Sequence, residues 1–218
     1  MKIENLSISY GNLKVFENFN IEFKEGKITA VLGRSGIGKT TLLKHVANLL
    51  NDKNNGFKPS VSFVFQTPCL VENLSVKSNI LLVQGCENKV ENGLEKVGLK
   101  DKINAKCKDL SLGEKQRVNL LRAFTFDSDV TLLDEPFSAL DLKTKNSAHE
   151  LFCSLFKNKK TAIIVTHDIE EALAVADEIV VIKEDKTVSY ITLPECAGLR
   201  NGLGLDEFRK KLLEILLY

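Results

Sequence analysis

The sequence has little net charge, no long hydrophobic run and no apolar leader. It holds 30 lysines and arginines against 29 aspartates and glutamates, so the net charge of +1 favours neither nucleic acid nor an anionic membrane as partner. No window reaches the roughly 18 apolar residues of a membrane-spanning helix. The opening residues MKIENLSISYG lack the apolar core of a signal peptide. We therefore expect any membrane association to depend on a partner protein.

Paired cysteines and repeats are also absent from the sequence. The cysteines are odd in number, widely spaced, and form no C-x-x-C pair. This pattern predicts free thiols scattered through the core of a protein in a reducing compartment rather than a disulfide framework or a metal site. The cysteines are Cys69, Cys86, Cys107, Cys153 and Cys196. No internal repeat or low-complexity segment breaks the chain.

Short apolar runs alternate with helical patterns along most of the chain. The composition, 44% hydrophobic and 27% charged over 218 residues, is typical of a single globular domain. The apolar runs predict buried strands, and they lie at 27–32, 61–65, 130–133, 161–165 and 178–183. Continuous apolar strands separated by helices indicate an α/β fold, with a mostly parallel sheet covered on both faces.

Three segments depart from this alternation. Residues 7–23 alternate apolar and polar side chains around Gly11-Asn12, which predicts an N-terminal antiparallel hairpin, and VSYITL predicts an antiparallel end to the sheet. Helical patterns between residues 75 and 98 predict a lobe. The tail is an amphipathic helix that packs on its own chain or, alternatively, at a subunit contact. We predict one domain over 1–218, divided into a core (1–66 and 111–190), a helical lobe (67–110) and a C-terminal helix (206–218).

A glycine-rich turn joins the first apolar strand to a helix. The stretch GRSGIGKTT fits the phosphate-loop pattern G-x-x-x-x-G-K-[ST] in the expected strand–turn–helix context. Glycines let consecutive backbone N–H groups converge on a phosphate, and the helix N-terminus adds partial positive charge. The side chain of Lys39 is expected to reach the β- and γ-phosphates of a nucleoside triphosphate, and the Thr40 hydroxyl to bind Mg²⁺. The predicted phosphate-binding residues are Gly33, Arg34, Ser35, Gly36, Ile37, Gly38, Lys39, Thr40 and Thr41.

Polar side chains follow three other apolar strands. Asp134 and Glu135 end VTLL, His167 follows TAIIV, and Gln66 follows VSFVF. Because ligands gather at the carboxyl ends of parallel strands, we expect these side chains beside the phosphate loop. Asp134 is suited to holding Mg²⁺, Glu135 to activating the attacking water and His167 to contacting the γ-phosphate. Gln66 alone is a weak signal. His45 and His149 lie within helical patterns, where we expect packing or surface positions.

The stretch LSLGEKQRV, residues 110–118, has the pattern of a helix start. Ser111 is a good N-cap, and Glu114 suits the first turn of a helix. From these residues alone the stretch is either an ordinary helix cap or part of a ligand site.

The set and order of these motifs, from about residue 2 to 185, resemble the nucleotide-binding subunit of an ABC transporter. The phosphate loop is similar to the Walker A motif, and VTLLDEP is similar to Walker B. FSALD resembles the D-loop, THD the switch-histidine segment and FQ the Q-loop. LSLGE stands in the place of the LSGGQ signature. The resemblance implies a P-loop ATPase that uses ATP and Mg²⁺. It assigns Glu135, His167 and Gln66 to catalysis, and Thr40, Gln66 and Asp134 to the metal.

The resemblance also implies a head-to-tail dimer of two copies of the chain. Ser111 and Gly113 of one copy would bind the ATP held by the other, and Tyr10 would stack on adenine. Two residues depart from the signature: Leu112 replaces a glycine and Glu114 a glutamine. Leucine does not readily adopt positive φ, so we expect Leu112 in helix-start geometry with its side chain directed away from ATP. The interval from Thr41 to Gln66 is short for the family, which predicts a trimmed sheet there.

The resemblance implies an ATPase that drives transport through two membrane permease subunits, at the cytoplasmic face of the cell membrane. The run THDIEEALAVADEIVVI is similar to importers of the nitrate, sulfonate and taurine branch, which implies import of a small anion or organic solute delivered by a solute-binding protein. No nucleic-acid partner is expected. Two alternatives stay open: a non-transport ABC ATPase, such as one in DNA repair or cell division, and an ATP-dependent regulatory switch with little hydrolysis.

Overall fold

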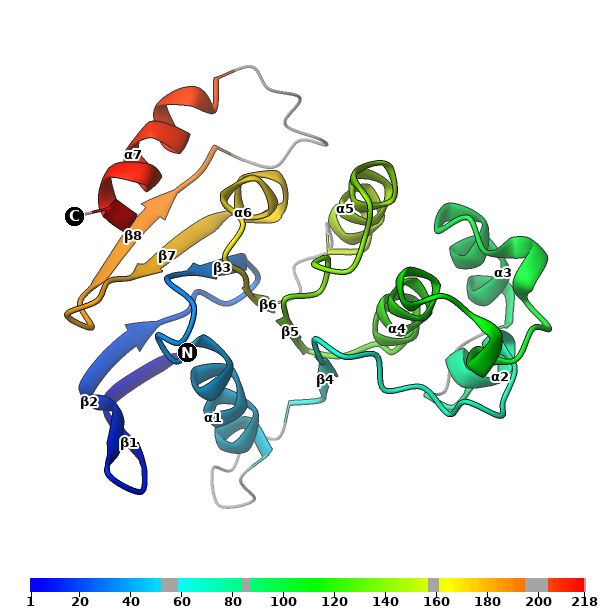
Figure 1. The fold of residues 1–218 in the computed structure, drawn as a ribbon, viewed down its shortest axis with the longest axis horizontal. Helices are drawn as coiled ribbons and strands as arrows, with labels where there is room; N and C mark the ends of the chain where they lie inside the picture. The colour runs from blue at the N-terminus through cyan, green and yellow to red at the C-terminus, as the bar shows by residue number, and fades with distance from the viewer. Residues whose placement is uncertain (52–58, 84–86, 157–160, 195–203, 218) are drawn as a thin grey trace.

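The protein is described by a computed structural model that covers residues 1–51, 59–83, 87–156, 161–194 and 204–217 (Figure 1). Its centre is a six-stranded sheet in the order β4-β5-β6-β3-β7-β8. All neighbouring pairs in this sheet are parallel except β7–β8, which is antiparallel. The strands are β3 (Ile28–Leu32), β4 (Val61–Val64), β5 (Val130–Asp134), β6 (Thr161–Val165), β7 (Glu178–Ile182) and β8 (Val188–Thr192). The predicted α/β fold with a mostly parallel sheet is confirmed.

One face of the sheet is covered by helix α1 (Lys39–Asn51) and by an antiparallel hairpin, β1 (Lys2–Tyr10) and β2 (Leu13–Glu22). The hairpin turns at Gly11, whose φ of 58° is readily adopted only without a Cβ. Phenylalanines of β2 and leucines of α1 share one buried cluster with the strands beneath them. This packing fixes the start of α1 at the carboxyl end of β3.

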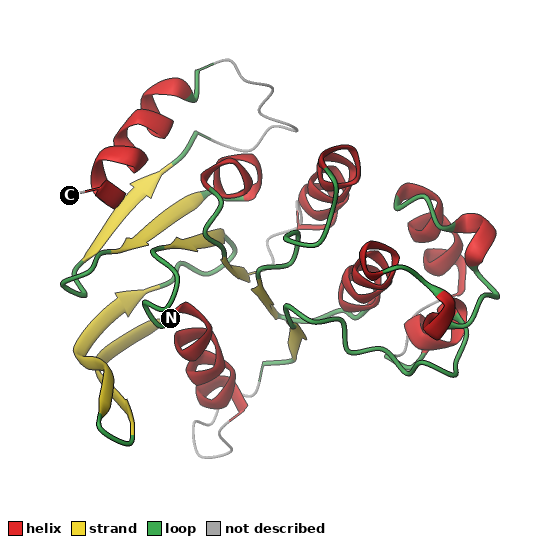
Figure 2. Ribbon diagram, in the orientation of Figure 1, coloured by secondary structure: helices red, strands yellow, loops and turns green. Residues whose placement is uncertain are grey.

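The opposite face of the sheet carries four helices. Figure 2 shows helices on both sides of the strands. The four helices are α4 (Leu112–Thr125), α5 (Leu142–Phe156), α6 (Ile169–Val175) and α7 (Asp206–Leu217). Leu212 of α7 is fully buried in a cluster with β3, β7 and α6, so the C-terminal helix packs on its own chain. No helix in the described part of the chain has the length and apolar character needed to cross a membrane.

A separate cluster of buried side chains holds α2 (Val76–Leu81) and α3 (Glu87–Lys96) against α4. α3 lies so close to α4 that a Cβ on Gly93 would stand 2.3 Å from Leu121 Cδ1. Short 3₁₀ turns at Lys100–Lys102 and Cys107–Asp109 lead back to α4. The helical segment thus has its own core, while the exact domain limits stay a prediction. The expected trimming between Thr41 and Gln66 falls partly on residues 52–58, outside the described residues.

The expectation of core cysteines is correct for two residues and wrong for one. Cys107 and Cys153 are buried, whereas Cys69 is exposed. Cys69 lies in the irregular connection between β4 and α2, and such connections run over the protein surface. Cys86 and Cys196 fall outside the described residues.

Candidate active site

The phosphate loop runs from the end of β3 to the start of α1, as the sequence predicts. Two of its glycines have left-handed backbones, with φ of 78° at Gly36 and 110° at Gly38. A Cβ on Gly38 would lie 2.6 Å from Val15 Cγ1 of the hairpin, and a Cβ on Gly33 would lie 2.9 Å from the Ile182 carbonyl oxygen. Glycine is therefore required at both positions by close packing, and at Gly38 also by its backbone conformation.

Lys39 lies inside the loop it terminates. Its ammonium donates to the carbonyl oxygens of Gly33 at 2.7 Å and Arg34 at 3.1 Å. The side chain is buried, and this burial lowers its pKa, while the charges of Glu135 and Asp134 act in the opposite direction. A buried ammonium has three donors, so a phosphate oxygen is a suitable acceptor for the third.

Thr40 and Asp134 bring two oxygen ligands together. The Thr40 hydroxyl donates to Asp134 Oδ1 at 2.9 Å, across 94 residues of sequence. Asp134 ends β5 and is buried, and this burial raises the pKa of its carboxyl, partly offset by the hydrogen bond from Thr40. Hydroxyl and carboxylate oxygens are ligands that Mg²⁺ prefers, so this pair fits a magnesium ion bound beside phosphate.

Glu135 is contacted from both neighbouring strands. Gln66 Nε2 donates to Glu135 Oε2 at 3.0 Å, and His167 Nδ1 lies 3.0 Å from Glu135 Oε1. Glu135 has a left-handed backbone, with φ of 43°, and its amide donates to the Val165 carbonyl of β6 at 2.9 Å. The structure thus brings together the three side chains that the sequence assigns to catalysis.

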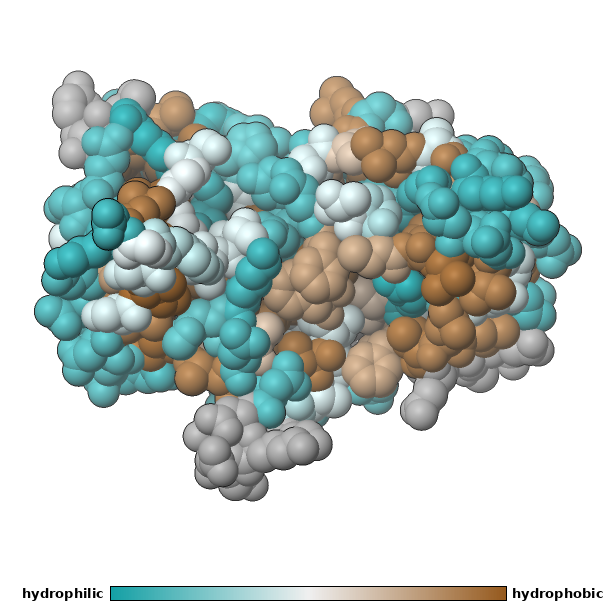
Figure 3. Space-filling view, turned by 60° about the horizontal axis from the view of Figure 1, so that its bottom comes forward, coloured by the Kyte–Doolittle hydropathy of each residue, from teal (hydrophilic) through white to brown (hydrophobic). Residues whose placement is uncertain are grey.

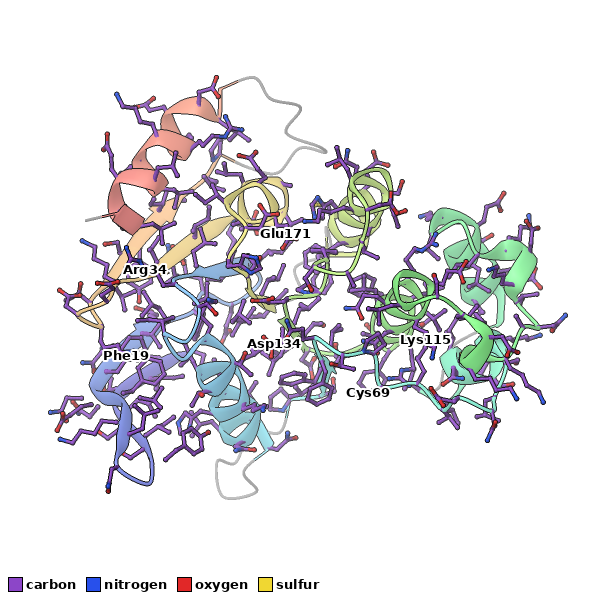
Figure 4. The ribbon with its side chains drawn as sticks, viewed as in Figure 1. Phe19, Arg34, Cys69, Lys115, Asp134 and Glu171 are labelled. Atoms are coloured by element: carbon purple, nitrogen blue, oxygen red, sulfur yellow. The ribbon has the colours of Figure 1, made fainter. Side chains whose placement is uncertain are left out.

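The order of the strands explains this convergence. Gln66 follows β4, Glu135 follows β5 and His167 follows β6, and these strands are adjacent and parallel. β3, which leads into the phosphate loop, is the next strand beyond β6. All four carboxyl ends therefore lie along one edge of the sheet, and Figure 4 shows Asp134 near its middle, beside α1.

The other predicted phosphate-binding residues lie on the loop or its flanks. Arg34 and Ser35 are exposed, Ile37 is buried, and Thr41 is half-buried in the first turn of α1. Tyr10 ends β1 and is 61% exposed, at the tip of the hairpin whose second strand packs against Gly38. The structure leaves the Tyr10 ring free to stack and does not seat it against the phosphate loop.

The signature-like stretch is a helix cap within its own chain. Ser111 is the N-cap of α4, and its hydroxyl accepts from the Glu114 amide, while the Glu114 carboxylate accepts from the Ser111 amide. Leu112 begins the helix, does not have a positive φ, and is 60% exposed. α4 packs against α2, α3, β4 and α5, and Figure 1 draws it on the far side of β5 from α1. One chain alone therefore keeps Ser111 and Gly113 apart from its own phosphate loop.

Three contacts around the site were not predicted from the sequence. Gln116 of α4 donates to the Pro136 carbonyl at 2.9 Å, which ties the signature helix to the residue after Glu135. Lys145 of α5 pairs with Asp168 and Glu171 at the start of α6. Lys186 donates to the carbonyl of Ile37 in the phosphate loop. Each contact joins segments that are distant in the sequence, so no local sequence pattern predicts it.

A family model, similar proteins and a solved structure all match this chain, and all of them are ATP-binding proteins or domains of ABC transporters. The family model described as "ABC transporter" matches residues 16–138, more than half of the chain. The chain belongs to the ABC transporter family. The aliphatic sulfonates import ATP-binding protein SsuB 2 of Pseudomonas savastanoi pv. phaseolicola is 33% identical over 99% of this chain and 83% of that protein. The aliphatic sulfonates import ATP-binding protein SsuB 1 of Streptomyces avermitilis is 37% identical over 98% of this chain and 85% of that protein.

A solved ABC cassette has the same fold. The dimeric structure of the ATP-binding cassette MJ0796, in a post-hydrolysis state bound to ADP and Pi, aligns with a TM-score of 0.75 and 26% identity. The alignment covers 89% of this chain and 99% of that one. The predictions of an ABC cassette and of ATPase activity are confirmed.

Proposed function

We propose that this ABC ATPase powers an importer, and that its hydrolytic site consists of the phosphate loop, Thr40, Asp134, Glu135, Gln66 and His167. The observation that carries the site is the contact of Glu135 with both Gln66 and His167, at 3.0 Å each, beside the Thr40–Asp134 pair. Such a cluster of a carboxylate, an amide and an imidazole can orient a water and accept its proton.

In the proposed reaction, the loop amides and Lys39 bind the phosphates of ATP. Glu135 accepts a proton from water, the water oxygen bonds to the γ-phosphorus, and the bond from that phosphorus to the β–γ bridging oxygen breaks to leave ADP and phosphate. His167 and Gln66 hold Glu135 and the water in place. Mg²⁺, held by Thr40 and Asp134 with Gln66 nearby, would neutralise charge on the phosphates. Positioning and electrostatics supply most of the rate enhancement in phosphoryl transfer.

We also propose that two copies assemble head to tail around ATP. Within one chain, Ser111 and Gly113 lie at the start of α4, away from the phosphate loop, so only another copy can bring such a pair to bound ATP. The dimeric cassette among the solved relatives supports this arrangement. Gly113 lies in the first turn of α4. The exposed side chain of Leu112 takes no part in the hydrogen bond between the Ser111 hydroxyl and the Glu114 amide.

A partner surface for the permease lies beside the site. A cavity of about 410 Å³ opens where β4 meets the lobe, and Val61, Phe63, Leu82, Asn119, Arg122 and Phe126 are among the residues that line it. Leu82 of this lining is 56% exposed, and Phe65, which is 42% exposed, stacks on the lining residue Phe63. Figure 3 shows hydrophobic surface in the middle of the molecule and on the lobe side. We infer that permease subunits dock here and hold the chain at the cytoplasmic face of the membrane.

The names of the relatives suggest the cargo. Proteins at 33% and 37% identity are named for import of aliphatic sulfonates, so we propose that this ATPase serves a transporter of small organic anions, loaded by a solute-binding protein. The ATPase does not itself hold the cargo in this assignment. The chain's own residues therefore support the energy-coupling role, and the cargo class rests on the relatives alone.

The test of the proposed site is Glu135→Gln. We expect this variant to keep ATP binding, to accumulate as an ATP-bound dimer in size-exclusion chromatography with magnesium and ATP, and to lose turnover by about two to four orders of magnitude, because the amide cannot accept the water proton. Glu150→Gln, on the exposed face of α5, is the matched control and should behave as the natural protein. Near-normal turnover in Glu135→Gln would show that the base lies elsewhere.

A further inference from the structure

The turn between β7 and β8 contains a residue in an unfavourable backbone conformation. Lys186 has φ of 65°, and the other described non-glycine residues with positive φ are Asn5, Asn18 and Glu135. Asparagine tolerates this region because its short side chain bonds locally, whereas lysine gains nothing of the kind. A non-glycine residue is held in such a conformation only where surrounding contacts fix it, and such residues concentrate at functional sites.

The contacts that fix Lys186 reach the phosphate loop. Its ammonium donates to the Ile37 carbonyl oxygen at 2.7 Å, across 149 residues of sequence. The same ammonium lies 5.2 Å from the centroid of the Phe16 ring, on the strand that packs against Gly38. This position is partly withdrawn from water, and the burial lowers the pKa of the lysine. The left-handed turn is what aims this side chain back across the sheet edge.

The bond to Ile37 acts on the next amide of the loop. The carbonyl of Ile37 and the N–H of Gly38 belong to one planar trans peptide, so they point in opposite directions. An ammonium that holds the carbonyl on the outer side therefore directs the Gly38 N–H to the inner side, where a loop of this kind meets phosphate. A cation on the carbonyl also polarises the peptide and makes its N–H a stronger donor.

A second contact from the same turn also reaches the phosphate loop. The same turn contributes Glu184, which pairs with Arg34, but both side chains are more than half exposed, and exposed pairs of this kind stabilise weakly. Beside the Arg34–Glu184 pair lies a cavity of about 290 Å³, lined by Ile37, Asp185 and Ile215 among others. Figure 4 shows Arg34 on the side of the loop that faces this turn. The loop is thus held by contacts to the turn as well as by the close packing of Gly33 and Gly38.

We propose that Lys186 is a positioning residue for ATP binding: from its left-handed turn, it fixes the Ile37–Gly38 peptide in the orientation that presents the Gly38 N–H to phosphate. The proposal rests on the phosphate-loop site described under the proposed function. It extends that site to a residue outside the phosphate loop and the other sequence motifs, 149 residues after Ile37.

Lys186→Gly tests the proposal because it removes the side chain and the backbone strain together. We expect the affinity for ATP, measured by isothermal titration calorimetry, to fall roughly tenfold, the loss expected from one charged hydrogen bond. The free energy of unfolding should change little, because the relief of backbone strain offsets the lost hydrogen bond to Ile37. Lys186→Arg keeps a cationic donor and should retain most of the affinity. Asn18→Gly, a positive-φ position in the hairpin, is the matched control and should bind ATP as the natural protein does.

Three further outcomes test this proposal, and the first two separate it from the site on which it rests. Lys39→Ala should abolish ATP binding in the same assay, and binding that survives this change would overturn the assignment of the loop itself. If Lys39→Ala loses binding while Lys186→Gly stays within twofold of the natural protein, the role of Lys186 is overturned. A Lys186→Gly variant that loses stability and affinity in parallel would also overturn it, because the lysine would then serve the fold alone.

Discussion

Two adjacent carboxylates illustrate how single residues acquire different roles. Asp134 is the last residue of β5, is buried, and meets the Thr40 hydroxyl. Glu135 leaves the strand with φ of 43° and faces Gln66 and His167 instead. The sequence predicts that the pair cannot duplicate each other, because side chains alternate along a strand. The left-handed turn that separates them is visible only in the folded chain.

His149 gives a prediction at the same scale. It is buried on α5, its ring stands edge-on to Phe137 with centroids 4.5 Å apart, and its Nε2 has no hydrogen-bond partner among the described residues. Burial, together with the charge of Lys145, lowers its pKa from 6.5 to about 4. The unfolded chain therefore takes up this proton first, so stability falls as the pH drops from the unfolded pKa toward the folded one.

We expect acidification from pH 7 to pH 5 to remove about 2 kcal/mol of stability through this histidine. His149→Gln cannot take up the proton, so its free energy of unfolding, measured by denaturant titration at both pH values, should fall by about that much less than in the natural protein. The comparison between the two proteins cancels the other titrating groups. An equal fall in both would show that His149 takes up its proton as readily in the folded state as in the unfolded one.

At the scale of elements, one lysine joins two helices that flank the site. Lys145, in the first turn of α5, lies 3.0 Å from Asp168 Oδ2 and 2.6 Å from Glu171 Oε1 of α6. Asp168 directly follows His167 and caps α6. Burial alone would lower the pKa of Lys145, but its hydrogen bonds to Glu171 and Asp168 raise it. Figure 4 places Glu171 on the side of α6 that faces α5. The bridge therefore fixes the segment that carries His167.

Lys145→Met should destabilise the protein by about 3 kcal/mol, because Glu171 is left as a buried charge without its partner. We also expect kcat to fall more than the KM for ATP rises, since His167 loses its support while the phosphate loop keeps its own. The double variant Lys145→Met/Glu171→Gln removes the unpaired charge and should recover part of the stability. Denaturant titration and steady-state ATPase assays measure both effects. A single variant with unchanged stability and kcat would contradict the bridging role.

The start of α4 is also decided at this scale. Ser111 and Glu114 form a reciprocal capping box, and the sequence predicts the helix start from these two residue types. The replacement at Leu112 leaves the cap intact because its side chain is 60% exposed on the helix surface. The tie from Gln116 to the Pro136 carbonyl could not be predicted, since it depends on how α4 lies across the end of β5.

At the scale of the whole molecule, the proposed permease surface makes a prediction about coupling. Leu82 lines the cavity beside β4 and is 56% exposed, so Leu82→Glu should leave folding and basal ATPase activity unchanged. The added charge should weaken docking, so that copurification with membranes containing the coexpressed permease falls by about tenfold or more, as expected when a charge is buried in an apolar contact. Leu213→Glu, on α7 and 44% exposed, is the matched control. Equal copurification of both variants would place the permease elsewhere.

The sequence by itself determined what depends on neighbouring residues. Apolar runs marked the strands, the glycine pattern marked the phosphate loop, and Ser111 with Glu114 marked the start of α4, because each of these is set by side chains only a few positions apart. Polar residues at strand ends could be recognised as candidates for the same reason.

The tertiary structure decided what depends on the order of the strands and on long-range contacts. Only the adjacency of β4, β5 and β6 brings Gln66 and His167 to Glu135, and only the fold carries Lys186 to the phosphate loop. The physical reason is that a strand's local pattern fixes its burial but not its neighbour in the sheet. The order of the strands is set by the packing of the whole chain. The site forms where this order brings the carboxyl ends of the strands together.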